Sequence, residues 1–360
     1  MDVAILGASG DVGREVAGQL VASRLVAPTE RLQLVGRHGG ASAQALYGLV
    51  SDLTDAYAEY VPDLDVALTP QDIVADLWVV TAGQTLPASA EIGGVDRNAL
   101  AQNNARLFAE YAGALAKYGQ GTEIVVIVSN PVELGVALFA RAIGRDRVIG
   151  IGAYQDTLRL RREIATDLGV RRQRVGGFMI GEHGDAQVPI WSSVTVHGLA
   201  PAELAQATTR LRRGTERQPF ADLVRAAREQ LTGLMAAGQV AEAFAYTDTL
   251  PPDVRVVVKP YITHLSGAKT VHATANVTVD LVRTLLDGRE VLVAGQVVLE
   301  PDEFYGLTGP LGVPVIASPG GIMRVVEIPL TPDEETQVRH LSGEISAKVN
   351  RWIASLEPAP

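Results

Sequence analysis

Cysteine is absent from the 360 residues of the chain, which excludes disulfide bonds, thiolate chemistry and cysteine-ligated metal sites. Long apolar runs are missing too, since none reaches the roughly 20 residues that a membrane-spanning helix needs. Basic residues are scarcer than acidic ones, 31 against 41, and the net charge of −10 disfavours nucleic acids and anionic membranes as partners. We therefore expect a small-molecule partner, no nucleic acid, no membrane and no bound metal.

The chain starts with Met1–Leu6, which carries no basic segment and leads directly into a glycine-rich loop. That start is unlike a signal peptide, so we expect a cytoplasmic protein. The length exceeds one ordinary hydrophobic core and suits two domains.

The first 150 residues alternate short β-rich apolar runs with amphipathic helical stretches. Apolar strands separated by helices are typical of a parallel sheet that is covered on both faces. Six such runs match the doubly wound dinucleotide-binding (Rossmann) fold, so we predict an α/β domain over residues 1–150. The runs are Val3–Leu6, Leu32–Val35, Val66–Leu68, Leu77–Val80, Ile124–Val128 and Val148–Ile149, with helices predicted at Val12–Ala22, Asn98–Lys117 and Val132–Ala142.

The pattern changes after residue 150, and residues 151–360 are predicted to form an α+β substrate domain. Its first elements are a helix over Gln155–Leu168 and a strand that ends at Ile180. The elements predicted after them are helices at Pro201–Arg213, Pro219–Ala245 and Thr274–Leu286, strands at Val291–Val298, Val313–Ile316 and Met323–Ile328, and a final helix at Pro332–Leu356. The proline-containing segment Asp248–Ser266 has no clear assignment.

Three glycines form a Gly-x-x-Gly-x-x-Gly loop between the first strand and the first helix. Glycines allow a tight turn and a close backbone approach, and the start of the helix offers free N–H groups to a pyrophosphate. The alternative is an ordinary strand-to-helix turn. We predict a dinucleotide site made of Gly7, Ser9, Gly10, Asp11, Val12 and Gly13.

The second predicted strand lacks the terminal acid that binds the adenosine ribose hydroxyls in NAD-binding folds. Gly36, Arg37 and His38 follow it instead. Arg37 can pair with a 2′-phosphate in bidentate fashion, although a solvated loop arginine is the simpler interpretation. NADP is therefore the predicted cofactor, with NAD possible.

A histidine stands between two glycines and two acids in Gly181-Glu182-His183-Gly184-Asp185. About one helix earlier, Asp156 and Arg159 are spaced i, i+3 and share a helical face, for which a structural ion pair is the usual explanation. Together, His183, Asp156 and Arg159 suggest an imidazole that exchanges a proton with a substrate hydroxyl, a carboxylate that orients it and a guanidinium that binds an anion. With a dinucleotide site at the other end of the chain, this combination indicates a dehydrogenase.

These motifs resemble the lactate/malate dehydrogenase superfamily of L-2-hydroxy acid dehydrogenases, in their order and near their spacing. The resemblance covers about the first 245 residues and returns at the last two predicted helices. It implies an NAD(P)-dependent oxidoreductase that interconverts a 2-oxo acid and an L-2-hydroxy acid, assembled as a homodimer or homotetramer. The matching segments are Gly7–Gly13, Thr81-Ala82-Gly83, Ser129-Asn130-Pro131-Val132, Arg147-Val148-Ile149-Gly150, Asp156-x-x-Arg159 and Gly181–Asp185.

The resemblance also implies roles for single residues. His183 is expected to be the general acid/base, Asp156 to orient and stabilise its ring, and Arg159 to bind the substrate carboxylate. Arg97 matches the loop arginine that polarises the carbonyl, and Asn130 matches the group that contacts the substrate oxygen and the cofactor.

The remaining family positions concern the substrate pocket and the cofactor site. Thr270 matches a threonine that lines the pocket, and His272 is an equal candidate for that position. The further cofactor-binding positions are Thr81, Ala82, Gly83 and Ser129.

The loop between Gly83 and Arg97 departs from the family pattern, because it is longer and contains no cation before Arg97. Malate enzymes of the family place an arginine third after the glycine, where this chain has Leu86. Burying an unpaired second carboxylate costs several kcal/mol. We therefore predict a 2-oxo monocarboxylate with a medium or large side chain, bound beside Leu86.

Three alternatives stay open. The chain is a malate dehydrogenase if a cation of the unassigned region, namely Arg255, Lys259 or Lys269, reaches the pocket. It is a catalytically inactive nucleotide-binding protein if the scaffold has lost its chemistry. The third alternative is a glycosidase that uses NAD, since such enzymes share the nucleotide fold. These glycosidases rely on metal ligands that include cysteine, which this chain lacks.

Overall fold

The computed structural model describes residues 1–84, 97–184 and 186–356, with the backbone alone for residues 97–100. The strands are β1 (Val3–Leu6), β2 (Arg31–Val35), β3 (Asp63–Ala67), β4 (Leu77–Val80), β5 (Ile124–Ile127), β6 (Val148–Gly150), β7 (Val175–Gly181), β8 (Gln187–Val196), β9 (Val291–Leu299), β10 (Gly309–Ser318) and β11 (Gly321–Val325). The α-helices are α1 (Asp11–Ala22), α2 (Ala41–Ala56), α3 (Arg97–Tyr118), α4 (Val132–Ile143), α5 (Gly152–Leu168), α6 (Pro201–Arg212), α7 (Phe220–Ala236), α8 (Val240–Asp248), α9 (Pro252–Leu265), α10 (Val271–Leu286) and α11 (Pro332–Ala354).

Six parallel strands form the first half of the sheet, in the order β3-β2-β1-β4-β5-β6. β1 lies inside it, with Val3 paired to Leu32 of β2 on one side and to Leu77 of β4 on the other. All four residues of β1 are fully buried, which explains why its sequence is apolar without alternation. The predicted α/β class, a doubly wound parallel sheet followed by an α+β region, is confirmed.

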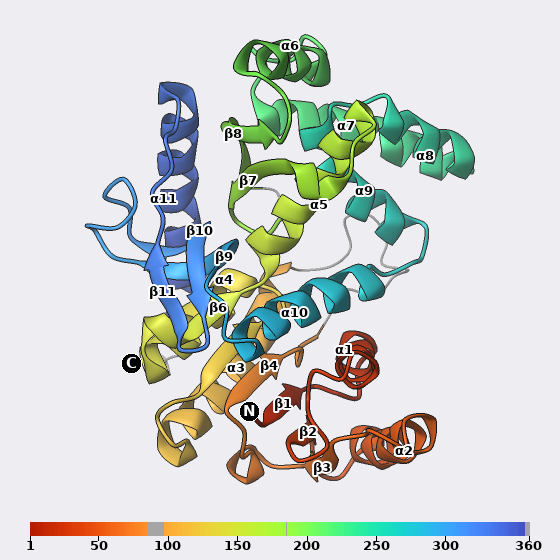
Figure 1. Cartoon of the computed structure of the whole chain (residues 1–360), viewed down its shortest axis with the longest axis vertical. Helices are drawn as coiled ribbons and strands as arrows, with labels where there is room; N and C mark the ends of the chain where they lie inside the picture. Colours follow the sequence, from red (N-terminus) through yellow and green to blue (C-terminus); the bar gives the residue numbers. More distant parts are fainter. Residues whose placement is uncertain (85–96, 185, 357–360) are drawn as a thin grey trace.

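The sheet continues beyond β6 into the second half of the chain. Gly150 of β6 pairs with Gln296 of β9, and β10, β7 and β8 extend the sheet from there. Gln296 is fully buried, and its Oε1 accepts the N–H of Ala153 at 3.0 Å. α10 also packs against α1 (Figure 1), and α11 packs against α3 and α4. The predicted domain boundary at residue 150 therefore falls where the two halves share one sheet, and it stays a prediction.

The observed elements differ from the predicted ones at two helical segments. The single helix predicted over 219–245 is wrong: α7 and α8 are separate, because Gly238 adopts a φ of +74° between them. The unassigned segment 248–266 is largely helix α9, which begins after Pro251 with Pro252 in its first turn. The sequence analysis also missed α2 and β8. None of the described helices has the length and apolarity to cross a bilayer.

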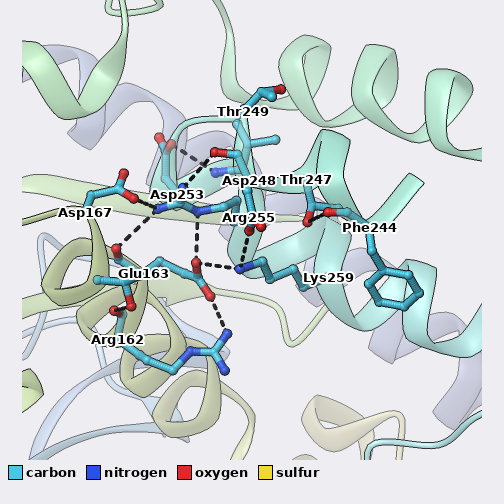
Figure 2. A network of polar contacts seen from close by, with 12 residues as sticks. Arg162, Glu163, Asp167, Phe244, Thr247, Asp248, Thr249, Asp253, Arg255 and Lys259 are labelled. Carbon is cyan, nitrogen blue, oxygen red and sulfur yellow. Dashed lines mark hydrogen bonds and ion pairs between the residues drawn. The ribbon is translucent and has the colours of Figure 1, made fainter. Parts of the chain in front are cut away.

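A buried network of ion pairs holds α9 against α5 (Figure 2). Arg255 of α9 is 3% exposed, and its Nε lies 2.9 Å from Oε2 of Glu163 while its Nη2 lies 2.7 Å from Oδ1 of Asp167. Nζ of Lys259 lies 2.9 Å from the same Glu163 oxygen. Burial opposes ionisation of Glu163, but Lys259 and Arg162 outweigh it and keep the pKa of Glu163 below its ordinary value. The network therefore sets the position of α9 relative to α5.

We expect Arg255→Leu to lower the free energy of unfolding by about 3 kcal/mol, the low end for a broken buried pair, because Lys259 still contacts Glu163. Arg162→Leu is the matched control: it removes an exposed partner of the same carboxylate and should cost less than about 1 kcal/mol. Urea-induced equilibrium unfolding measures both. Equal costs would mean that the network does not hold α9.

Candidate functional site

Asp156, Arg159 and His183 meet at one wall of a cavity. Asp156 and Arg159 project from α5, and His183 follows the end of β7 by two residues. Oδ2 of Asp156 lies 2.8 Å from Nδ1 of His183, and Oδ1 accepts a hydrogen bond of 2.9 Å from Nη1 of Arg159. The Asp156 side chain is 4% exposed, so one buried carboxylate joins the histidine and the arginine.

Two glycines bring His183 against α5. At Gly152, the first residue of α5, a Cβ atom would lie 2.3 Å from Cβ of His183, so a larger residue displaces the histidine. At Gly181 the φ angle is +110°, and the N–H of Glu182 then donates to the carbonyl of Ala186 at 2.7 Å. The turn that carries His183 therefore requires both glycines.

The charges around His183 favour its protonated form. Burial by itself lowers the pKa of His183, but attraction to the Asp156 carboxylate outweighs it and raises that pKa above its ordinary value. Burial also opposes ionisation of Asp156, yet His183 and Arg159 hold the pKa of Asp156 below its ordinary value. The proton of this pair therefore resides on the ring.

A second buried carboxylate, Glu133 in the first turn of α4, holds the backbone of the same histidine. Oε1 of Glu133 accepts the N–H of His183 at 2.8 Å. Burial, followed by repulsion from Glu182, raises the pKa of Glu133 to about 7. Glu182 is in turn paired with Lys348 of α11 at 2.6 Å, which connects the last helix to the turn that carries His183.

The cavity next to these side chains has a volume of about 300 Å³. α9 contributes the apolar groups Val256, Val257 and Pro260, while α5 and the His183 turn contribute polar ones. A site of this size and composition suits a small polar molecule with an apolar part.

Asn130 lines the cavity from the end of β5. Its carbonyl accepts a hydrogen bond of 2.7 Å from Nδ2 of Asn104, and Oδ1 of Asn104 accepts the N–H of Gln84 at 2.7 Å. Asn104 is 1% exposed, so it ties the chain after β4 to the end of β5. Sequence reasoning missed Asn104, whose signal was a polar side chain within the apolar pattern of α3.

The glycine loop before α1 suits a nucleotide phosphate. Gly7 has a φ of +83°, and a Cβ at Gly13 would lie 2.4 Å from the Gly7 carbonyl oxygen. Gly10 is the N-cap of α1 and has no side chain to cap the helix, so backbone N–H groups face the loop. Thr81 donates to the carbonyl of Leu6 at 2.7 Å, which places the Thr81–Gly83 segment, with Ala82, beside the loop. The residues present therefore fit a dinucleotide pyrophosphate.

The end of β2 places its polar groups beside this loop. Arg37 and His38 are exposed directly after the strand, while Gly36 is buried. Oγ of Ser9 lies 2.8 Å from Oγ of Ser42 at the start of α2. Within residues 36–42 there is no acid, and no group of three or more metal-ligating side chains occurs among the described residues.

Of the remaining predicted site residues, Thr270 and Ser129 lie within the described part of the chain. Thr270 lines the cavity, whereas the alternative, His272, is exposed and pairs with Glu15 at 3.0 Å. Ser129 follows β5 and donates to the Val80 carbonyl at 3.2 Å. Leu86, Asp185 and the side chain of Arg97 lie outside the described residues, so their predicted roles stay predictions.

The three cations considered for a malate enzyme are not among the described residues that line the cavity. Arg255 and Lys259 belong to the network between α5 and α9 (Figure 2). Lys269 pairs with Asp11 at the start of α1, at 2.6 Å. Sequence reasoning missed a different cation, Arg228 of α7, which does line the cavity.

Two family models match the sequence. Residues 1–150 match the model described as lactate/malate dehydrogenase, NAD binding domain. Residues 155–250 match the model described as lactate/malate dehydrogenase, alpha/beta C-terminal domain. The first match contains the glycine loop, and the second contains Asp156, Arg159 and His183.

Relatives that match nearly the whole chain include both malate dehydrogenases and lactate dehydrogenases. A malate dehydrogenase of Methanococcus maripaludis is 28% identical over 93% of both chains. An L-lactate dehydrogenase of Kosmotoga olearia is 27% identical over 99% of this chain and 98% of its own.

Solved structures share the fold over nearly the full length. The lactate dehydrogenase of Cryptosporidium parvum, complexed with lactic acid and nicotinamide adenine dinucleotide, matches with a TM-score of 0.72 and 24% identity, covering 100% of this chain and 98% of its own. The malate dehydrogenase of Aeropyrum pernix matches with a TM-score of 0.71 and 23% identity, covering 98% and 97%.

We expect Asp156→Asn to lower the pKa of His183, because burial and the Arg159 charge then act against the imidazolium without the carboxylate. NMR titration of labelled histidines measures this, with the His183 signal assigned by its loss in His183→Asn. An unmoved His183 pKa would show that Asp156 does not stabilise the charged ring.

Proposed function

Because the chain belongs to the lactate/malate dehydrogenase superfamily, we propose that it catalyses the NADP(H)-dependent interconversion of a 2-oxo acid and an L-2-hydroxy acid. The observation that carries the proposal is the Asp156 carboxylate bonded at once to His183 and to Arg159 on the wall of a small cavity.

His183 acts as the general acid in reduction and as the general base in oxidation. Its Nδ1 is engaged by Asp156, which leaves Nε2 to exchange a proton with the substrate. The Asp156 carboxylate raises the pKa of His183, which favours the protonated ring that can give up a proton. A bound nicotinamide cofactor would supply the hydride for the carbonyl carbon. The protonated His183 would give its proton to the carbonyl oxygen, so that a hydroxyl forms and the ring becomes neutral.

Arg159 binds the carboxylate next to the reacting carbon. Its guanidinium is held by Asp156 through Nη1, which leaves its other N–H groups for the substrate. Asn130, at the same cavity, is placed to contact the substrate oxygen or the cofactor. Arg97 polarises the carbonyl in this proposal, by the resemblance to the family.

The preference for NADP rests on the end of β2. No acid occupies residues 36–42, where NAD enzymes place one for the ribose hydroxyls. Arg37 is exposed at this point and can pair with a 2′-phosphate. The hydroxyls of Ser9 and Ser42 offer further donors beside it.

The candidate substrates fall into two classes, 2-oxo monocarboxylates and 2-oxo acids with a second acidic group on the side chain. The loop before Arg97 favours a monocarboxylate, because Leu86 stands where malate enzymes carry an arginine. Arg228 favours a second acidic group, because it brings a cation to the cavity from another helix. Activity with pyruvate, 2-oxoisocaproate and oxaloacetate tests the proposed function itself. Retained cofactor binding without activity on any 2-oxo acid would support an inactive nucleotide-binding protein.

We expect His183→Asn to reduce kcat by about 10² to 10⁴, the usual contribution of a positioned acid/base, with cofactor affinity nearly unchanged. His340→Asn, in an exposed position on α11, is the control and should keep wild-type kcat. Steady-state oxidation of NADPH and cofactor fluorescence titration measure the two quantities. A His183→Asn enzyme with most of its kcat would remove His183 from the proton transfer.

The wild type should prefer NADPH over NADH by about ten- to hundredfold in kcat/KM, since one charge-assisted contact contributes about 1.5–3 kcal/mol. Arg37→Ile should abolish this preference, and Gly36→Asp with Arg37→Ile should reverse it. At Gly36 a Cβ would lie 2.6 Å from Cδ1 of the buried Leu46 and 2.8 Å from Oγ of Ser42, so Gly36→Asp requires both side chains to shift. Equal use of both cofactors by the wild type would contradict the role of Arg37.

A further inference from the structure

We infer that Lys269, from the second half of the chain, is a cofactor-positioning residue: it compensates the charge of Asp11 at the start of α1 and offers a cation to the pyrophosphate of the dinucleotide. The inference rests on the dinucleotide site of the proposed function and on no step of the reaction. Lys269 lies just before α10, and its Nζ is 2.6 Å from Oδ2 of Asp11. No motif marks this lysine, because the contact depends on how α10 packs against α1.

Asp11 places a negative charge where the glycine loop is to receive an anion. It is the first residue of α1, directly after the N-cap Gly10. A carboxylate is favourable at the start of a helix, but it repels a pyrophosphate that binds to the same N–H groups. The hydrogen bond and the charge of Lys269 hold the pKa of Asp11 below its ordinary value, and Arg14 adds a weaker attraction, so the ionised carboxylate is favoured. The loop therefore needs a cation beside Asp11 before it can bind a pyrophosphate well.

The ion pair between Lys269 and Asp11 is open to a ligand. The side chain of Lys269 is 42% exposed and that of Asp11 is 59% exposed. Ion pairs with this exposure add little to stability, so the pair is not explained by a need to hold the fold together. An ammonium group has three N–H donors, so Lys269 can keep its contact with Asp11 and bind a phosphate oxygen as well.

The turn that carries Lys269 is fixed against α1 by a second contact. Nδ1 of His272 lies 3.0 Å from Oε1 of Glu15. His272 follows Lys269 by three residues, and Glu15 follows Asp11 by four, so each pair of residues spans about one helical turn. The start of α10 therefore meets the start of α1 along one side.

The other side of this turn belongs to the substrate cavity. Thr270 and Thr274 line the cavity, and Oγ1 of Thr274 accepts a hydrogen bond of 3.1 Å from Nε2 of Gln155. Gln155 is buried on α5, next to Asp156. Lys269 thus stands on a turn that is attached to both α1 and α5, which places its ammonium at the glycine loop before a cofactor binds.

Fluorescence titration with NADPH and with NADH tests the inference. Both cofactors carry the same pyrophosphate, so Lys269→Gln should weaken the binding of both by about five- to tenfold at low ionic strength and leave the preference between them unchanged. The loss should shrink as KCl is added, because salt screens an exposed charge. Arg37→Ile gives the contrast, since it should weaken NADPH binding alone.

A second substitution at Asp11 tests the electrostatic cause. Asp11→Asn in the Lys269→Gln background removes the uncompensated carboxylate, so the double variant should recover most of the lost affinity. Arg14→Gln is the matched control, because Arg14 also attracts Asp11 but forms no ion pair with it among the described residues. It should weaken binding less than Lys269→Gln does. Circular dichroism verifies that each variant is folded.

These titrations involve no turnover, which separates the inference from the proposed reaction. A chain that binds the cofactors and shows these effects but reduces no 2-oxo acid would refute the reaction and support the inference. Wild-type affinity in Lys269→Gln, a loss confined to NADPH, or a double variant that binds no better than Lys269→Gln would overturn the inference and leave the dehydrogenase in place. A wild type that binds neither cofactor would overturn both.

Discussion

The buried carboxylate of Asp156 is the group on which the site depends. A charge with 4% exposure is stable only if cations compensate it, and here His183 and Arg159 do so from two different elements. The same compensation orients the imidazole, raises its pKa and holds the guanidinium still. In the proposed function, proton transfer by His183 and anion binding by Arg159 therefore depend on the same buried carboxylate, so a change at Asp156 affects both.

α5 connects this arrangement to α9, which also lines the cavity. Its first half carries Asp156 and Arg159, and its second half carries Glu163 and Asp167, which hold α9 through Arg255. Buried ion pairs are rarely the strongest way to hold two helices, but they define one relative position. Because α9 also carries Tyr261, the network behind the cavity helps to set where the ring under Arg228 lies.

Sequence reasoning predicted the elements whose pattern is local. β1 and β4 were predicted with their observed bounds, because a strand buried on both faces is a continuous apolar run and a glycine loop marks its end. α2 was missed because just Leu46 and Leu53 of its residues are buried, which leaves little periodicity. The long helix 219–245 was predicted whole because the break depends on the conformation of Gly238.

The site residues that belong to a sequence motif could be predicted. Those that reach the site through the packing of helices could not. His183, Asp156 and Arg159 stand in recognisable motifs, and the structure brings them together. Asn104 and Arg228 carry no motif, because their positions depend on how α3 meets β5 and how α7 meets α9. The three cations considered from sequence are engaged in ion pairs that the sequence does not reveal. Arg255 and Lys259 pair with Glu163 of α5, and Lys269 pairs with Asp11 of α1.

The pairing of β6 with β9 limits how this protein can exchange parts with others. Many nucleotide-binding folds are treated as modules that recombine with new partners at a linker. Here a cut after residue 150 would expose an edge of β6 and uncover the face of α1 on which α10 packs. The first half of the chain therefore shares both a sheet and a helix-packing surface with the second half. A recombinant that keeps its solubility must inherit β9 and α10 along with it, so new specificities are easier to obtain by changing α7 and α9 than by swapping halves.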